Sequence, residues 1–311
     1  MTSKYSRPGE EPPPDFPLDR ALLRRRFSRA AARCDEAAFL VREIARRMDE
    51  RLDYIRIAPR RILDLGCGTG GDLERLGARY PMAERIGIDF AEPMLARARQ
   101  RLAPRAGGLR RLFGSARPAL QLAAADAARL PLPDASVTLA WSNLTLASID
   151  TPQPVLREIY RALEDGGLVM FSTLGPDTLR ELRDALPARG GARVHRFTDM
   201  HDLGDALLRA GFADPVMDME ILTLTYTRLD ELFADLRAAG GNNAARMRAR
   251  GLSGRAGWEA ARARYDTLRR EGRLPVSVEI VQGHAWKTAP APPSDGRAVV
   301  RLHPPARRPA G

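Results

Sequence analysis

The feature that most constrains the fold is a glycine-rich turn at the end of a short apolar run. The run and turn together read Ile62-Leu63-Asp64-Leu65-Gly66-Cys67-Gly68-Thr69-Gly70, and residues 72–79 after them are predicted to form a helix. Glycines at such a turn permit positive φ and let a ligand approach the backbone closely. A strand, a tight turn and a helix in this order predict the first unit of a parallel α/β sheet.

The chain after this turn repeats the same alternation of strand and helix. Further strands are expected at 85–89, 120–124, 137–141 and 168–173, with helices at 92–102 and 151–163. This alternation predicts a doubly wound α/β sheet with right-handed crossovers. Beyond residue 174 we expect helices at 177–185 and 199–210, an extended segment at 216–226, interrupted helices over 228–270 and a last strand at 276–286.

Composition excludes several classes of protein. The 311 residues are 44% hydrophobic and 29% charged, which are values of a globular protein. No stretch approaches the roughly 18 apolar residues of a membrane span, and the polar, proline-rich residues 1–17 lack the apolar core of a signal peptide. The two cysteines and four histidines lack metal-ligand spacing, so no metal is expected. We therefore expect a cytoplasmic protein that does not enter the membrane.

The net charge of +11 arises from 50 basic and 39 acidic residues, and all but two of the basic residues are arginine. Two interpretations stay open: a general arginine bias on ordinary helix faces, or a surface that attracts an acidic partner. No zinc-finger spacing or RNA-recognition motif is present, so a nucleic-acid partner is not expected.

Acidic residues lie at the ends of three successive predicted strands, and they indicate which class of ligand can bind there. Gly66, Gly68 and Gly71 alone also match a dinucleotide fingerprint. Asp64, two residues before the first glycine, would repel a pyrophosphate but suits an ammonium or sulfonium group. Asp89 is placed to accept hydrogen bonds from ribose hydroxyls, and Asp126 to accept one from an adenine amino group. The pattern indicates a cationic nucleoside ligand.

These motifs, together with Leu130-Pro131-Leu132, resemble those of class I S-adenosylmethionine-dependent methyltransferases. The resemblance implies a Rossmann-like, doubly wound, mostly parallel seven-stranded sheet with helical lid elements, and S-adenosyl-L-methionine as the cofactor. The cofactor-binding residues that it implies are Asp64, Gly66, Cys67, Gly68, Gly70, Asp89, Phe90, Asp126, Ala127 and Ser142.

A narrower resemblance covers roughly residues 22–286. The segments 27–31, 140–144, 156–161 and 171–183 are similar to the biotin-synthesis malonyl-[acyl-carrier protein] O-methyltransferases. That family methylates the free carboxylate of a malonyl thioester on an acidic carrier protein. A cation should hold this carboxylate, and the candidates are Arg157, Arg180 and Arg183. Phe27, Phe39 and the helices after 228 would form the lid, and arginines within 246–270 would meet the carrier protein.

The expected organisation has six parts. They are a disordered tail (1–18), an N-terminal helical lid segment (19–58), a cofactor-binding core (59–227), a helical lid insertion (228–275), a last sheet strand (276–288) and a disordered basic tail (289–311).

Two departures from the family keep other functions open. Cys34-Asp35 stands where members commonly have Tyr-Asp, and 146–149 lacks their aromatic pair. Segments 171–183 and 199–212 also resemble the complex I assembly factor that hydroxylates an arginine, and a non-catalytic binding protein is a third possibility. We expect Asp72 to be only a helix-capping residue, and His195 and His201 to be surface or capping residues.

Overall fold

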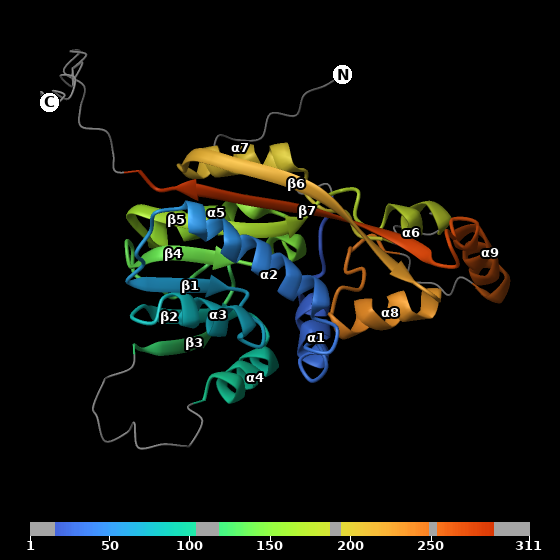
Figure 1. Cartoon of the computed structure of the whole chain (residues 1–311), viewed down its shortest axis with the longest axis horizontal. Helices are drawn as coiled ribbons and strands as arrows, with labels where there is room; N and C mark the ends of the chain where they lie inside the picture. Colours follow the sequence, from blue (N-terminus) through green and yellow to red (C-terminus); the bar gives the residue numbers. More distant parts are fainter. Residues whose placement is uncertain (1–15, 104–117, 187–193, 249–253, 289–311) are drawn as a thin grey trace, which may run out of the picture.

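The computed structural model describes residues 16–103, 118–186, 194–248 and 254–288 (Figure 1). Its centre is one seven-stranded sheet in the order β3-β2-β1-β4-β5-β7-β6. The strands are β1 (Arg61–Leu65), β2 (Glu84–Asp89), β3 (Leu120–Ala124), β4 (Val137–Ser142), β5 (Leu163–Leu174), β6 (Ala213–Tyr226) and β7 (Leu274–Trp286). The expected tail at 289–311 and most of the expected loop at 106–120 lie outside the described residues.

The helices occupy nearly the expected segments. They are α1 (Arg20–Ala30), α2 (Phe39–Arg51), α3 (Gly71–Arg79), α4 (Glu92–Leu102), α5 (Pro152–Ala162), α6 (Arg180–Ala185), α7 (Met200–Ala210), α8 (Leu229–Ala238) and α9 (Gly254–Asp266), with the 3-10 turns η1 (Leu52–Tyr54) and η3 (Thr145–Ser148). None of the described helices has both the length and the apolar character needed to cross a bilayer.

Strand direction confirms the expected fold class. Strands β1 to β5 pair in parallel, and β7 runs antiparallel to β5 and β6. One boundary differs from expectation, because β5 begins at Leu163 rather than 168. The Gly166 amide donates to the Lys287 carbonyl (2.7 Å), and the Lys287 amide donates to the Gly167 carbonyl (2.9 Å). These bonds make residues 166–167 part of the sheet.

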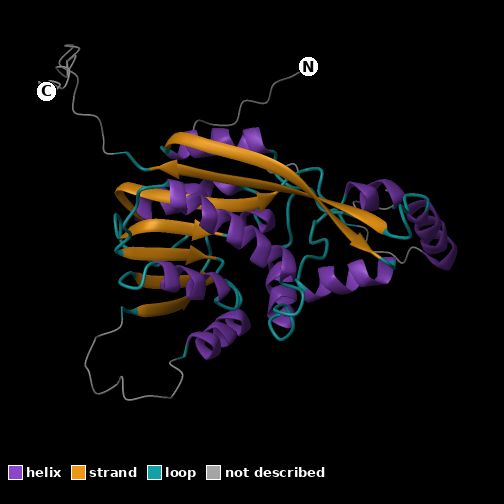
Figure 2. Cartoon of the chain, viewed as in Figure 1, coloured by secondary structure: helices purple, strands orange, loops and turns teal. Residues whose placement is uncertain are grey.

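Helices cover both faces of the sheet (Figure 2). On one face, α5 and α7 pack over side chains of the central strands such as Leu63, Val169 and Val281. On the other face, α2, α6 and α8 bury a second cluster that includes Trp141 and Met170. The central strands are therefore apolar on both sides, as buried parallel strands require.

The N-terminal segment lies beyond the carboxyl ends of the strands, beside α4 and near α8 (Figure 1). Leu18, which we expected in the disordered tail, is only 2% exposed, and its amide donates to Asp150 Oδ2 (2.8 Å). Phe27 meets Phe90 edge to face, with ring centroids 5.7 Å apart. This packing places α1 against α4 and against the residues that follow β2.

Candidate cofactor and substrate site

The turn after β1, residues 66–70, forms the base of the site. Gly66, Gly68 and Gly70 adopt φ values of +74°, +51° and +83°, which L side chains rarely adopt. The amides of Gly66 and Cys67 both donate to the Ile88 carbonyl, at 2.7 and 3.1 Å, and tie the turn to β2. The sequence therefore places glycine where the backbone conformation requires it.

Space around the turn differs from glycine to glycine. A Cβ on Gly66 would lie 1.9 Å from Thr145 Oγ1, whereas a Cβ on Gly68 would meet nothing within 4 Å. Thr145 Oγ1 itself donates to the Leu65 carbonyl (2.8 Å). Gly66 is thus packed against the protein, and Gly68 leaves open room where a ligand can approach.

Asp89 holds the turn from the end of β2. Its Oδ2 accepts from the Gly68 amide (3.0 Å) and its Oδ1 from the Ala91 amide (2.8 Å). Burial raises the pKa of the Asp89 carboxyl, although these amide donors oppose the rise. Each carboxylate oxygen can accept a second hydrogen bond, so Asp89 can hold the turn and bind a ligand hydroxyl together.

Asp64 is the most unusual carboxylate of the site. It is 1% exposed in β1, and its Oδ2 has no hydrogen-bond partner among the described residues. Burial and the neighbouring carboxylates of Asp72 and Asp89 raise the pKa of Asp64 well above its ordinary value. Ser142 Oγ, at the end of β4, is also buried without a partner in the described part of the chain. Such groups require a ligand that donates or carries positive charge.

Asp72 is not the solvated helix cap that we expected. Its Oδ2 accepts from Trp141 Nε1 (3.0 Å) and from Asn143 Nδ2 (2.9 Å), and burial raises its pKa. The prediction was wrong because a fully buried indole N–H needs an acceptor, and Asp72 supplies one. Asn143 Oδ1 in turn accepts from Ser172 Oγ (2.8 Å), which links the ends of β4 and β5.

Asp126 and Phe90 lie at the outer side of the site. Asp126 is exposed, and its carboxylate accepts from Arg20 of α1 (2.9 Å) and from the Ala128 amide (3.0 Å). Phe90 and Ala127 are half-buried. The three predicted acids therefore lie at the carboxyl ends of β1, β2 and β3, with Asp64 and Asp89 buried and Asp126 exposed.

The segment between α1 and α2 is held onto the turn by one side chain that sequence reasoning missed. Asp35 Oδ1 accepts from Thr69 Oγ1 (2.7 Å), and its Oδ2 accepts from Arg101 Nη2 (2.5 Å). Cys34 is half-buried, with its Sγ 3.9 Å from Met94 Sδ, and burial raises its thiol pKa. No local signal predicts the Asp35 contacts, because Thr69 is 34 residues away along the chain.

The predicted cationic residues lie farther out. Arg157 is exposed on α5, and Arg180 is exposed at the start of α6, with Asp177 and Glu181 each 3.5 Å away. Arg183 donates to the carbonyls of Pro176 and Thr178, so it stabilises the turn before α6. The contacts of Arg180 and Arg183 named above do not involve Asp64, Asp72, Asp89 or Asp126.

His195 is not the surface or capping residue that we expected. It is 9% exposed, its Nε2 lies 3.2 Å from the Ala147 carbonyl in η3, and its ring packs on Phe197. Burial lowers its pKa, which keeps the ring neutral at physiological pH. His201 is exposed next to the α7 cap residue Asp199, as expected.

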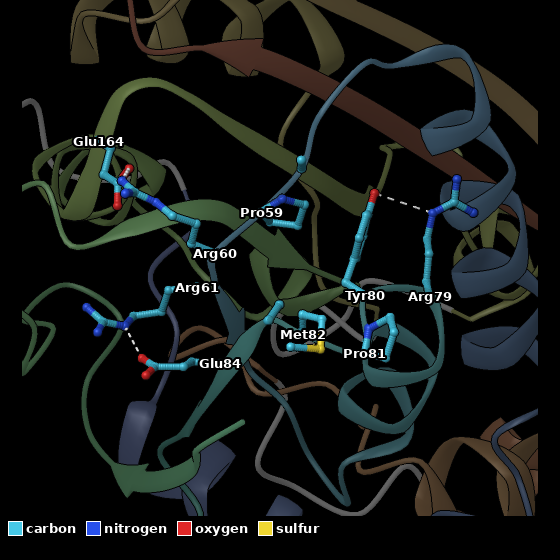
Figure 3. A pocket seen from close by; sticks show the side chains of 11 residues that line it. Pro59, Arg60, Arg61, Arg79, Tyr80, Pro81, Met82, Glu84 and Glu164 are labelled. Carbon is cyan, nitrogen blue, oxygen red and sulfur yellow. Dashed lines mark hydrogen bonds and ion pairs between the residues drawn. The ribbon is translucent and has the colours of Figure 1, made fainter. Parts of the chain in front are cut away.

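A surface hollow of about 760 Å³ lies elsewhere on the molecule (Figure 3). It is lined at the amino-terminal ends of β1 and β2, and Arg60 and Arg61 pair there with Glu164 (2.7 Å) and Glu84 (2.8 Å). Its charges are therefore already compensated, and it lies at the sheet edge opposite the glycine-rich turn. We do not include it in the site.

Comparison with known proteins identifies the family. Residues 63–171 match the family model described as a methyltransferase domain. A malonyl-[acyl-carrier protein] O-methyltransferase of Laribacter hongkongensis is 49% identical over 93% of this chain and 97% of its own. The relative of the same name from Gallionella capsiferriformans is 44% identical over 92% and 97%. The chain belongs to the malonyl-[acyl-carrier protein] O-methyltransferase family.

Solved structures agree on the fold. A candidate methyltransferase from Bacillus halodurans superposes with a TM-score of 0.51 at 16% identity, covering 78% of this chain and 99% of its own. The YcgJ protein of Bacillus subtilis gives 0.50 at 15% identity, with coverage of 78% and 98%. At such identities these matches concern the fold alone.

The site of this family member fits its cofactor, S-adenosyl-L-methionine. The unpartnered Asp64 oxygen suits a sulfonium or ammonium group, and the open space beside Gly68 admits a ligand. A pyrophosphate would meet Asp64, Asp72 and Asp89 together, which argues against a dinucleotide. The chain is therefore an S-adenosylmethionine-dependent methyltransferase, and the hydroxylase alternative is not favoured.

Proposed function

We propose that this enzyme methylates the free carboxylate of malonyl-[acyl-carrier protein], the ester-forming step that precedes chain elongation in biotin synthesis. The observation that carries the proposal is the 49% identity to a relative bearing that name, over 97% of the relative's length. We further propose that the enzyme works in the cytoplasm.

We assign the cofactor-binding roles from the geometry of the acidic ends of the strands. Asp64 would attract the positive end of S-adenosylmethionine, Asp89 would accept from the ribose hydroxyls, and Asp126 would accept from the adenine amino group. When bound, the cofactor supplies an electrophilic methyl group. The remaining residues that would line it are Gly66, Cys67, Gly68, Gly70, Phe90, Ala127 and Ser142.

The reaction that we propose needs no general base. A carboxylate with an ordinary pKa near 4 is already ionised at neutral pH, so it can accept a methyl group directly. Burial raises the pKa of the Cys67 thiol, so this cysteine stays protonated and does not compete as a nucleophile. The protein has to orient the acceptor and exclude water. Residues 31–38, which Asp35 holds onto the turn after β1, can help to exclude water.

The acceptor carboxylate still needs a cationic partner. Arg157 and Arg180 remain our candidates for this role, and both guanidinium groups are exposed enough to meet a ligand. Arg183 is a weaker candidate, because its Nη2 already donates to the carbonyls of Pro176 and Thr178.

A genetic experiment tests substrate and pathway together. A biotin-requiring bacterial strain that lacks its own malonyl methyltransferase should grow without biotin when it carries this chain. The same strain carrying the Asp89→Ala variant should not grow, since cofactor binding is impaired. Failure of the wild-type chain to restore growth, with the protein present and folded, would contradict the proposed substrate.

A further inference from the structure

The outer face of α1 carries an unusual concentration of positive charge. The helix contains five arginines and no acidic residue. Leu23, Phe27 and Ala30 face inward, against the loop at 244 and Phe90. Arg24, Arg25 and Arg29 are exposed on the opposite arc of the helix.

These three arginines form no close ion pair in the described part of the chain, although Arg25 helps to lower the pKa of the nearby Asp19. Within residues 16–103, 118–186, 194–248 and 254–288, no carboxylate lies within ion-pair distance of Arg24, Arg25 or Arg29. The inward-facing Arg26 donates only to the carbonyls of Asn242 and Asn243, and burial together with Arg248 and Arg25 lowers its pKa. Arg25, Arg26 and Arg248 therefore repel one another, although Arg248 also pairs with Asp19 (3.5 Å).

Helix α9 lies within the segment 246–270, where we expected the partner-binding arginines, and it has a different charge balance. Arg255 pairs with Glu259 (2.8 Å), and Arg262 reaches Asp230 (2.7 Å). Arg269, just after the helix, pairs with Asp266 (2.6 Å). These three arginines are therefore paired with carboxylates of the same protein.

Position separates the two helices as well. Helix α1 borders the cofactor site, because Arg20 pairs with Asp126 and Phe27 packs on Phe90. Helix α9 packs against α6, and its Tyr265 hydroxyl donates to the Pro275 carbonyl near the start of β7 (2.8 Å). In Figure 1 it lies at the far end of the molecule from α4 and the turn after β1. A large partner docked on α1 would sit beside the site.

We propose that Arg24, Arg25 and Arg29 form the surface on which the acidic acyl carrier protein docks. The inference rests on the proposed function, and it replaces our expectation that arginines within 246–270 serve this purpose. Complementary charge speeds encounter and sets orientation, so the contribution should fall on kcat/KM for the protein substrate. A small malonyl thioester reaches the same site without needing the surface of α1.

Two charge-matched variants test the proposal. One carries Arg24→Glu, Arg25→Glu and Arg29→Glu, and the control carries Arg255→Glu, Arg264→Glu and Arg270→Glu, which changes the net charge equally. We measure kcat/KM for malonyl-acyl carrier protein and for malonyl-coenzyme A at low and moderate salt. The α1 variant should lose about tenfold or more with the carrier protein, together with its salt dependence. It should change little with the coenzyme A thioester, and the α9 variant should resemble wild type.

The other outcomes each overturn a defined statement. Equal losses in both variants would show that total charge matters rather than α1, and an unchanged α1 variant would remove the docking surface. Loss of binding to duplex DNA or anionic vesicles without loss of kcat/KM would assign the face to a different partner. If wild type binds S-adenosylmethionine but does not methylate malonyl-acyl carrier protein, the proposed function fails instead. Calorimetric cofactor binding checks folding, and the milder triple Arg→Gln variant decides if the glutamate variant does not fold.

Discussion

At the scale of single residues, the site brings three buried carboxyl groups close together. Burial raises the pKa values of Asp64, Asp72 and Asp89 together, and Asp64 also feels the other two. In the ligand-free protein this arrangement costs stability, because a buried carboxylate favours its protonated form. A bound cationic ligand favours the ionised carboxylate instead, and this change affects the pH dependence of binding.

The first prediction concerns the pH dependence of cofactor binding. The pKa of Asp64 is higher in the folded protein than in the unfolded chain. At pH values between these two pKa values the folded protein binds more protons, so the stability of the ligand-free protein falls as pH rises through this range. Cofactor affinity should rise over the same window, since a bound cation favours the ionised carboxylate. Calorimetry from about pH 5 to about pH 8 measures it.

Asp64→Asn provides the matched comparison. This variant should bind S-adenosylmethionine about tenfold or more weakly, show a flatter pH dependence, and melt at a higher temperature without ligand. Unchanged affinity in the variant would remove Asp64 from the cofactor site.

The second prediction concerns Asp89. Replacement by alanine removes the acceptor of the Gly68 and Ala91 amides as well as the expected ribose contact. The loss should be about 1.5–3 kcal/mol, or roughly ten- to a hundredfold in affinity. Titration calorimetry with S-adenosylmethionine is the measurement, and wild-type affinity in the variant, or tight NADH binding to the wild type, would refute the assignment.

At the scale of elements, two glycines allow the cost of backbone strain to be measured apart from an effect on cofactor binding. Gly68 (φ +51°) and Gly166 in β5 (φ +78°) each have open space where a Cβ would go. Alanine at either position should cost about 1–2 kcal/mol of stability from the left-handed conformation. Only Gly68→Ala should also weaken cofactor binding, as thermal melts and calorimetry on both variants would reveal. Equal affinities would mean that the turn does not contact the ligand.

The cover formed by residues 31–38 gives a fourth prediction. Asp35→Ala removes the bonds to Thr69 and Arg101 and should raise KM for S-adenosylmethionine several-fold, because such partly exposed bonds contribute about 0.5–1 kcal/mol each. Glu36→Ala is the control, since Glu36 is exposed and, among the described residues, pairs with Arg33 of its own segment. Similar KM values for the two variants would show that Asp35 does not hold the cover closed.

The elements that sequence predicted best are those with strong local signals. The helix at 92–102 has the expected bounds, and β3 and β4 begin at their predicted residues, whereas β5 begins five residues early. The turn at residues 31–38 interrupts the segment that we expected to be helical (19–58), and its Asp35 contacts Thr69 and Arg101, which no local pattern predicts. Asp72 and His195 were misassigned for the same reason, since Trp141 and Ala147 reach them only in the folded chain.

At the scale of the whole molecule, the sheet order explains why the predicted acids gather. Strands β1, β2 and β3 are parallel neighbours, so their carboxyl ends bring Asp64, Asp89 and Asp126 to one edge. The N-terminal segment then closes this edge through Phe27 and Asp35. The chain has a net charge of +11 and yet gathers three carboxyl groups at this edge, a combination that suits a cationic cofactor at the site and an acidic protein partner on the surface.

The most direct test of this account is methyl transfer with purified components. The enzyme, S-adenosylmethionine and malonyl-acyl carrier protein are combined, and the carrier protein is analysed by intact mass spectrometry. The account predicts a gain equal to one methylene group, an ester that releases methanol on saponification, and no gain with acetyl-acyl carrier protein, which lacks a free carboxylate. An unmodified malonyl-acyl carrier protein, from enzyme that binds S-adenosylmethionine normally, would contradict it.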